Sequence, residues 1–272
     1  MILVKHEKDA ERKAQWVRTV DFAIPDLTQQ SDDLAAFIAL AQKDSIDKKD
    51  RFTIALSGGS LSNMPKGLIS NPFMKWDKGQ VYCVDECIVP LDHADYNHRA
   101  YTDALFAHVP IPTENIHTID PTLFGDLDEL SDSYEKLLIR EFSGKGNERF
   151  PVFDLILLGV GPDGHTASLF PSHELLAETD RWVAYLEDSP KPPLRRITFT
   201  YPVINHAARV VFVASGDDMA ATVADVLDCP EKGVPAALVR PVLPGQLYWF
   251  VDDPAASKTT YPGTSFDQII CR

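Results

Sequence analysis

Cysteine is scarce in this chain, with four residues in 272 and no CxxC pair. Such sparse spacing excludes a disulfide framework and the usual zinc sites, and it is typical of a protein of the reducing cytoplasm. No apolar run approaches the ~18 residues that a membrane helix requires. The chain begins with only three apolar residues before Lys5, too few for the core of a signal peptide. We therefore expect a cytoplasmic protein with neither a metal nor a membrane partner.

Basic residues are also in short supply. The sequence has 26 Lys and Arg against 40 Asp and Glu, a formal net charge of −14. Because non-specific binding to nucleic acid or to an anionic membrane needs a positive surface, this balance argues against both. Hydrophobic residues make up 44% of the chain and aromatic residues 10%, which is enough for a packed core. The length suits one large α/β domain or two small ones, and we interpret residues 1–272 as a single domain.

Short apolar runs alternate along the chain with segments of helical periodicity. Several runs are apolar without alternation, which indicates strands covered on both faces. Repeated strand, helix and strand predicts an α/β fold with a mostly parallel sheet. The first 30 residues allow two interpretations, a helix and strand that begin the sheet or a loosely held arm. The predicted strands are 52–56, 81–84, 153–158, 182–186, 197–201, 210–214, 236–239 and 247–251, the predicted helices are 32–41, 97–106, 129–142 and 219–227, and 85–96 and 189–195 are predicted to be irregular.

Small or ionisable residues follow four of the predicted strands. They are Ser-Gly-Gly-Ser at 57–60, Asp-Glu at 85–86, Gly-Val-Gly-Pro-Asp-Gly-His at 159–165 and Ser-Gly-Asp-Asp at 215–218. In an open α/β sheet, ligands bind beyond the carboxyl ends of the strands. We therefore expect the four clusters to meet at one edge of the sheet and to form the functional site.

The segment Ser57, Gly58, Gly59 and Ser60 has the composition of an anion cradle. Two glycines let backbone N–H groups point at a phosphate, and the hydroxyls add donors beside a helix N-terminus. No Gly-Lys-Ser/Thr follows, so the segment is not a nucleotide-triphosphate loop. The alternative is a simple glycine turn in which Ser60 caps a helix.

Gly159, Gly161 and Gly164 match the GxGxxG pattern of dinucleotide-binding proteins, with an acidic residue about 20 positions later. Two prolines argue against that function. Pro162 has no N–H to offer a pyrophosphate, and Pro171 interrupts the helix that should follow. A tight turn at 163–164 that directs the next residue to the edge of the sheet fits better.

That next residue, His165, is the strongest candidate for a general base, with the carboxylate of Asp163 two positions away. The alternative for any histidine is a satisfied structural role. Asp85 and Glu86 allow three interpretations: paired acid/base groups, one group that orients a substrate hydroxyl while the other holds a loop, or two solvated acids. Cys87 is a possible nucleophile or a small hydrophobic residue.

Two adjacent arginines, Arg195 and Arg196, precede a predicted strand. A guanidinium offers a two-pronged contact to a phosphate, so either is a candidate ligand. The alternative is a solvated start of a strand.

Residues 158–171, LGVGPDGHTASLFP, resemble the signature of the 6-phosphogluconolactonases. The resemblance extends to the segments 57–60, 85–90 with His93, 189–193 followed by 196–198, and 247–250. It implies a three-layer, doubly wound, mostly parallel fold shared with glucosamine-6-phosphate deaminases and ribose-5-phosphate isomerases. It also implies hydrolysis of 6-phospho-D-glucono-1,5-lactone to 6-phosphogluconate, in the oxidative branch of the pentose phosphate pathway, without a cofactor or metal.

On this chain, the resemblance implies that His165 deprotonates the water that attacks the lactone C1 and that Asp163 orients His165. The phosphate is then expected on 57–60 and Arg196. The residues expected to complete the substrate-binding set are Asp85, Glu86 and Gly164.

The chain departs from the family pattern at two positions. Cys87 stands where the family usually has an arginine after Asp-Glu, and Met219 stands where it has the lysine of Gly-x-x-Lys. Another cation, such as Arg99, Lys191 or Arg195, would have to compensate. The alternatives are a weakly active or non-catalytic phosphosugar-binding protein and a phosphosugar isomerase or deaminase on the same fold. In each case the partner is a small-molecule phosphosugar, and we expect a monomer.

Overall fold

The computed structural model describes residues 19–24, 27–143 and 149–263. The predicted arm or helix in 1–18 lies outside these ranges. Residues Thr19–Ile24 form strand β1, so this part of the N-terminal region belongs to the sheet. None of the helices in the described ranges is both long and apolar enough to span a membrane.

The main sheet has seven strands in the order β1-β10-β9-β6-β2-β3-β5, and every neighbouring pair is parallel. All five residues of β2 are buried, as expected for a strand covered on both faces. From β2 the chain builds outward through β3 to β5, and it then returns to place β6 on the other side of β2. The strands are β1 (Thr19–Ile24), β2 (Phe52–Leu56), β3 (Gly79–Cys83), β5 (Ile116–His117), β6 (Leu155–Gly159), β9 (Arg209–Ala214) and β10 (Gln246–Asp252).

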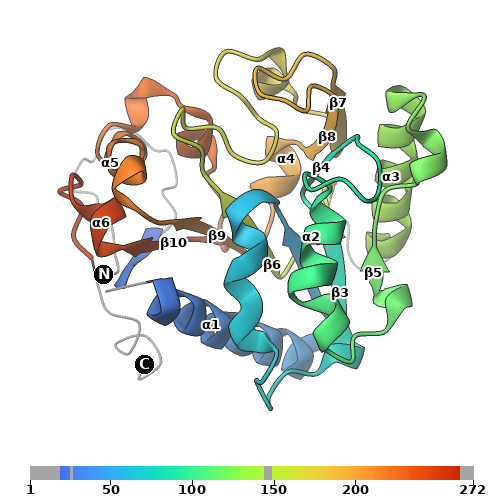
Figure 1. The fold of residues 1–272 in the computed structure, drawn as a ribbon, viewed down its shortest axis with the longest axis horizontal. Helices are drawn as coiled ribbons and strands as arrows, with labels where there is room; N and C mark the ends of the chain where they lie inside the picture. Colours follow the sequence, from blue (N-terminus) through green and yellow to red (C-terminus); the bar gives the residue numbers. More distant parts are fainter. Residues whose placement is uncertain (1–18, 25–26, 144–148, 264–272) are drawn as a thin grey trace.

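Helices cover both faces of this sheet, which confirms the predicted three-layer α/β fold (Figure 1). Successive strand residues enter opposite layers: Leu155 and Leu157 pack in one buried cluster, and Ile156 and Leu158 pack in the other. The first cluster contains residues of α1 (Leu27–Lys49) and α2 (Asn97–Ala104). The second contains residues of α3 (Leu127–Phe142), α4 (Tyr201–Ile204), α5 (Ala220–Asp228) and α6 (Asp253–Ala256).

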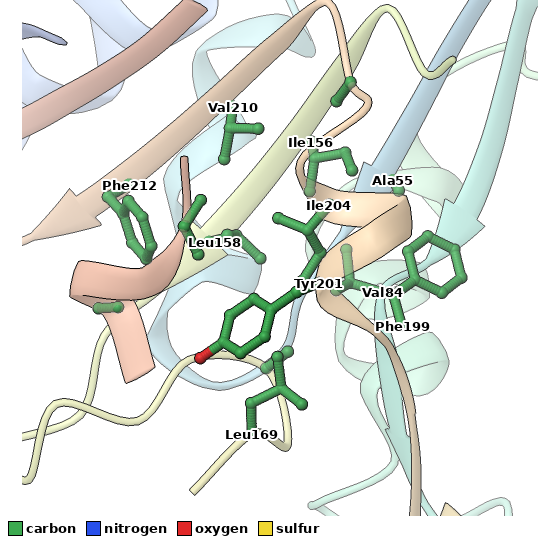
Figure 2. Close-up of a cluster of buried hydrophobic side chains, with 14 of the residues drawn as sticks. Ala55, Val84, Ile156, Leu158, Leu169, Phe199, Tyr201, Ile204, Val210 and Phe212 are labelled. Atoms are coloured by element: carbon green, nitrogen blue, oxygen red, sulfur yellow. The ribbon is translucent and has the colours of Figure 1, made fainter. Parts of the chain in front are cut away.

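The second cluster lies directly beneath the turn that follows β6. Figure 2 shows Tyr201 at the start of α4 with its ring between Leu158 of β6 and Leu169 of the following loop. The Tyr201 hydroxyl donates to the carbonyl of Pro235 at 2.9 Å, so its buried polar atom is satisfied. This packing anchors the loop after β6 to the rest of the core.

A second sheet corrects the expectation that all the strands share one sheet. It contains β4 (Asp85–Cys87), β8 (Arg196–Phe199) and β7 (Val183–Leu186), and its pairs are antiparallel. Residues 85–87, predicted to be irregular, are therefore a strand. Val84 makes the transition, because its N–H donates to Leu56 of β2 and its carbonyl accepts from Phe199 of β8.

The predicted strand at 236–239 is wrong. Residues Pro235–Leu238 form a 3-10 helix, whose first turn suits the fixed φ of proline, and the Ala236 N–H donates to the Gly164 carbonyl at 2.9 Å. An apolar run of four residues does not distinguish a strand from a buried turn. The other 3-10 helices are η1 (Gly59–Leu68), η2 (Trp76–Lys78), η3 (Phe106–His108), η4 (Thr113–Asn115), η5 (Pro121–Leu123), η6 (Glu174–Ala177), η7 (Asp217–Met219) and η8 (Pro230–Lys232).

Candidate active site

A cavity of about 590 Å³ opens where β2 and β6 end side by side. This is the place at which the strand order reverses, the usual ligand site of an open α/β sheet. Three of the four predicted clusters contribute to it. Its lining includes all of 57–60 after β2, Gly159–Gly161 and His165 after β6, and Asp85, Cys87 and Arg196 from the small sheet.

The fourth cluster, 215–218, does not line this cavity. It follows β9, which is separated from β2 by β6. The Gly216 N–H donates to the buried carboxylate of Asp252, and the Ser215 hydroxyl donates to Gln30. These contacts hold the ends of β9 and β10 together. The segment lies at the predicted edge of the sheet, because β9 runs parallel to β6, but it is outside the cavity.

His165 lies at the end of a tight turn, as its sequence predicted. Gly164 has a φ of +80°, a conformation that other residues rarely adopt, and its N–H donates to the Gly161 carbonyl at 2.8 Å. Nδ1 of His165 lies 2.5 Å from Oδ1 of Asp163. The next helical element after the turn is the 3-10 helix η6 rather than an α-helix, and the glycine pattern therefore lacks the context of a dinucleotide fingerprint.

The charge on Asp163 determines which nitrogen of His165 is available. Burial tends to raise the pKa of Asp163, but hydrogen bonds from His165 and from Nζ of Lys191, at 2.9 Å, outweigh it and lower the pKa to about 2. An ionised carboxylate only accepts, so Nδ1 of His165 must carry the proton in their contact. In the neutral ring Nε2 then has a free lone pair, as a general base requires.

An aromatic ring links the candidate base to the candidate phosphate ligand. The His165 ring stacks on Phe170 with the ring centres 4.8 Å apart, and the Arg196 guanidinium carbon lies 5.4 Å from the same ring centre. Phe170 is fully buried. It therefore restricts the orientation of both functional groups.

The predicted anion cradle, 57–60, directly follows the end of β2 and includes the first residues of η1. Gly59 and Ser60 are exposed there, with their backbone at the N-terminus of the 3-10 helix. The Ser57 hydroxyl is buried and donates to Oδ1 of Asp85 at 2.7 Å. Ser57 thus shapes the cradle, while Gly59 and Ser60 present its accessible surface.

Asp85 and Glu86 are both buried, which excludes two solvated acids. Asp85 lines the cavity and accepts hydrogen bonds from the hydroxyls of Ser57 and Ser168, at 2.7 and 3.0 Å. It therefore joins the cradle to the loop that follows His165. Glu86 does not line the cavity; its carboxyl oxygens accept three backbone N–H groups, so it is the acid that holds a loop.

Gly164 does not line the cavity either. Its carbonyl accepts the Ala236 N–H, and its positive φ allows the turn. That Glu86 and Gly164 bind the substrate stays a prediction, and neither residue lines this cavity. Gly164 forms the turn that places His165.

The two arginines have different roles. Arg196 lines the cavity and donates to the carbonyls of Lys191, Pro192 and Pro193. Arg195 donates to the Phe124 carbonyl and lies 3.6 Å from a Glu187 oxygen, away from the cavity.

The two departures from the family pattern fall in different environments. Cys87 lines the cavity and pairs across the sheet with Arg196. Burial raises the pKa of its thiol to about 12, so the thiol is neutral near pH 7 and the nucleophile hypothesis is disfavoured. Met219 packs in the hydrophobic core and does not line the cavity.

Of the cations considered for compensation, Lys191 lies nearest the base, with Nζ 3.3 Å from Nδ1 of His165. It acts on Asp163 and does not line the cavity. Arg99 is paired with Asp103, and Arg195 is engaged elsewhere. Among the described residues, Arg196 is therefore the one arginine or lysine whose side chain lines the cavity.

For the lactone hydrolysis that the resemblance implies, we expect Cys87→Arg to raise kcat/KM by no more than about tenfold, about 1.4 kcal/mol. The gain is small because Arg196, the partner of Cys87 on the neighbouring strand, already supplies a guanidinium. Met219→Lys should lower the melting temperature without a gain in rate, since it buries a charge in an apolar cluster. Steady-state kinetics and thermal unfolding of both variants check this. A several-hundredfold rescue by Cys87→Arg would instead mean that the parent site is incomplete.

Several residues in or beside the cavity had no assigned role in the sequence analysis, among them Ser168 and Asn97. The Ser168 hydroxyl donates a hydrogen bond to Asp85. The one sequence feature that pointed to Ser168 was its place within the 158–171 signature. Asn97 lines the cavity and donates from Nδ2 to the Asp85 carbonyl at 2.9 Å, and it lay inside a predicted helix with no distinguishing pattern. Among the residues in the described ranges, no group of three or more His, Cys, Asp or Glu side chains is arranged to hold a metal ion.

Comparison with known proteins agrees with this geometry. Residues 25–249 match the family described as glucosamine-6-phosphate isomerases/6-phosphogluconolactonase. The human 6-phosphogluconolactonase is 44% identical over 223 residues, which are 78% of this chain and 82% of the human protein.

Solved structures give the same result. The 6-phosphogluconolactonase of Trypanosoma cruzi superposes with a TM-score of 0.78 at 25% identity, covering 92% of this chain and all of that one. A monomeric glucosamine-6-phosphate deaminase shares the fold, with a TM-score of 0.68 at 20% identity and coverage of 88% and 99% of the two chains. The chain therefore belongs to the glucosamine-6-phosphate isomerase/6-phosphogluconolactonase family.

Proposed function

We propose that this protein hydrolyses 6-phospho-D-glucono-1,5-lactone to 6-phosphogluconate, and that His165 activates the water. One observation carries the proposal: an ionised Asp163 holds the His165 proton on Nδ1, beside a cavity that the predicted anion cradle also lines. The family membership supports the same substrate, and its human relative is named a 6-phosphogluconolactonase.

The reaction needs one proton to move twice. Nε2 of His165 takes a proton from water as its oxygen attacks C1 of the lactone, and Asp163 stabilises the imidazolium that forms. The tetrahedral intermediate then breaks its bond between C1 and the ring oxygen, and the imidazolium returns the proton to that oxygen. The product is the open-chain acid, and the base is regenerated without a cofactor.

The phosphate is assigned to the part of the cavity lined by 57–60 and Arg196. The exposed backbone of Gly59 and Ser60 and the Arg196 guanidinium provide donors of the kind that phosphate oxygens accept. Because the phosphate is remote from C1, these contacts hold substrate and transition state about equally. They should govern affinity, whereas His165 governs rate.

The test is lactone loss in excess of spontaneous hydrolysis, measured without added cofactor and repeated with a chelator. Catalysis in both conditions supports the proposal. Phosphosugar binding without a rate would support the non-catalytic alternative. Exchange of a carbon-bound proton or release of ammonia, from the corresponding phosphosugars, would support an isomerase or deaminase.

We expect Arg196→Ala to raise KM and the Kd of 6-phosphogluconate by about tenfold or more, with a smaller effect on kcat. Arg195→Ala is the matched control, because it removes the adjacent guanidinium outside the cavity. Calorimetric titration with 6-phosphogluconate at fixed salt gives both affinities. Equal affinities for the two variants and the parent would show that Arg196 does not bind the phosphate.

A further inference from the structure

Glu86 is a fully buried acid that the proposed reaction does not use. Its Oε1 accepts the N–H groups of Cys87 and Asn97 at 2.9 and 2.7 Å, and its Oε2 accepts the N–H of His98 at 3.0 Å. The last two are the first N–H groups of α2, which otherwise lack partners within a helix. Glu86 therefore ties the end of β4 to the start of α2.

The residue placed at that helix start is Asn97, which reaches the anion cradle. Its side-chain Nδ2 donates to the Asp85 carbonyl, and its amide packs against the Gly58 backbone so closely that a Cβ at Gly58 would lie 1.8 Å from Oδ1. Any side chain at residue 58 would collide with it. The position of α2 thus sets the path of the backbone that leads into Gly59 and Ser60.

The surroundings of Glu86 disfavour its charged form, but its role as a hydrogen-bond acceptor does not depend on that charge. Burial, with a smaller contribution from the neighbouring charge of Asp85, raises its pKa to about 8 against the opposing effect of the three N–H donors. The other ionisable groups that interact with it are the hydroxyls of Tyr96 and Tyr134 and the thiols of Cys83 and Cys87, all with pKa values raised by burial. Whether protonated or ionised, a carboxyl group offers two accepting oxygens, and all three N–H groups depend on them.

We propose that Glu86 is a positioning residue for phosphate recognition: by holding the start of α2, it places Asn97 against Gly58 and so shapes the anion cradle. This inference rests on the proposed function, because it assigns the phosphate to that cradle. Glu86 touches neither the substrate nor the reacting atoms. Its removal should therefore weaken binding of the phosphate rather than the chemical step.

The test compares Glu86→Gln with Asp154→Asn. Glutamine keeps the size of the side chain but puts an amide donor against one of the N–H groups. Asp154 is a matched control, since it is a buried acid that accepts the Thr53 N–H and hydroxyl at the opposite ends of β2 and β6. Each variant is titrated with 6-phosphogluconate, with unphosphorylated gluconate and with inorganic phosphate, and kcat and thermal unfolding are measured alongside.

We expect Glu86→Gln to raise the Kd of 6-phosphogluconate and of inorganic phosphate by about tenfold, with gluconate affinity and kcat within about threefold. Asp154→Asn should lower the melting temperature and leave all three affinities unchanged. If Glu86→Gln does not fold, Asn97→Ala takes its place, because it removes the amide but keeps the backbone N–H groups, and the same selective loss is expected. Phosphate affinities equal to those of the parent, or an equal loss for gluconate, would overturn the inference.

These readouts also separate this inference from the function on which it rests. The titration with inorganic phosphate reports on the cradle even if the protein does not hydrolyse the lactone. A protein that lacks lactonase activity but loses phosphate affinity in Glu86→Gln contradicts the proposed reaction alone. An active lactonase whose phosphate affinity is unaffected contradicts the role of Glu86 alone.

Discussion

Replacement of His165 by alanine is expected to lower kcat by ~10²–10⁴, with less than about a threefold change in the Kd of 6-phosphogluconate. The reason is that Nε2 of His165 accepts a proton only as the transition state forms, whereas the contacts assigned to the phosphate hold substrate and transition state about equally. Cofactor-free lactone hydrolysis gives the rate, and calorimetry gives the affinity.

The chain offers a matched control in a second histidine and aspartate pair. Nε2 of His173 lies 3.1 Å from Oδ1 of Asp188, and neither residue lines the cavity. His173→Ala should retain the parent kcat. A His165→Ala protein with the parent rate would show that another group activates the water, and the mechanism proposed for this site would be wrong.

Asp163→Asn should have the second largest effect, a loss in kcat on the order of 10²–10³. An asparagine can present its amide N–H to Nδ1 of His165, which moves the ring proton to Nε2 and removes the base. It also removes the carboxylate that pairs with Lys191. Asp188→Asn is the control, and an unchanged kcat in Asp163→Asn would show that the ring does not depend on Asp163 for its orientation.

The lowered pKa of Asp163 adds a dependence of stability on pH. The folded state holds the pKa near 2, below the usual value of 3.8, so the ionised carboxylate favours folding above about pH 4. That contribution is lost as the pH falls through 4 towards 2. The difference in melting temperature between the parent and Asp163→Asn should therefore shrink over this interval, as measured by thermal unfolding at each pH. A difference that does not change with pH would mean that Asp163 is not stabilised as an anion.

Much of the site was predictable because it depends on local sequence. The runs 52–56 and 153–158 are mostly apolar without alternation, which indicates buried strands, and residues after parallel strands gather at one edge. A glycine at 164 predicts a turn, because glycine adopts conformations that other residues rarely do. The position of His165 directly after this turn therefore followed from the local sequence. The candidate base His165, its partner Asp163 and the candidate cradle at 57–60 could therefore be predicted from the amino-acid sequence alone, and the structure places His165 and the cradle at one cavity.

Other features depend on pairings between residues far apart in the chain. Residues 85–87 are a strand because 196–198 lie beside them, and three polar or small residues carry no strand pattern of their own. Lys191 reaches Asp163 across 28 positions, which no local periodicity encodes. For the same reason, the composition of 215–218 suits the site, but its neighbours in the sheet hold it elsewhere.

The roles of buried polar residues also come from their partners rather than from their type. Glu86 and Asp85 are adjacent in sequence and equally acidic, yet one accepts three backbone N–H groups outside the cavity and the other faces it. Met219 occupies a position that the family pattern marks as cationic, but it packs in the core. Amino-acid type and order specified the central strands, the turn and the candidate base in this protein, whereas packing between distant segments specified which polar groups line the cavity, because burial and hydrogen bonding depend on the whole fold.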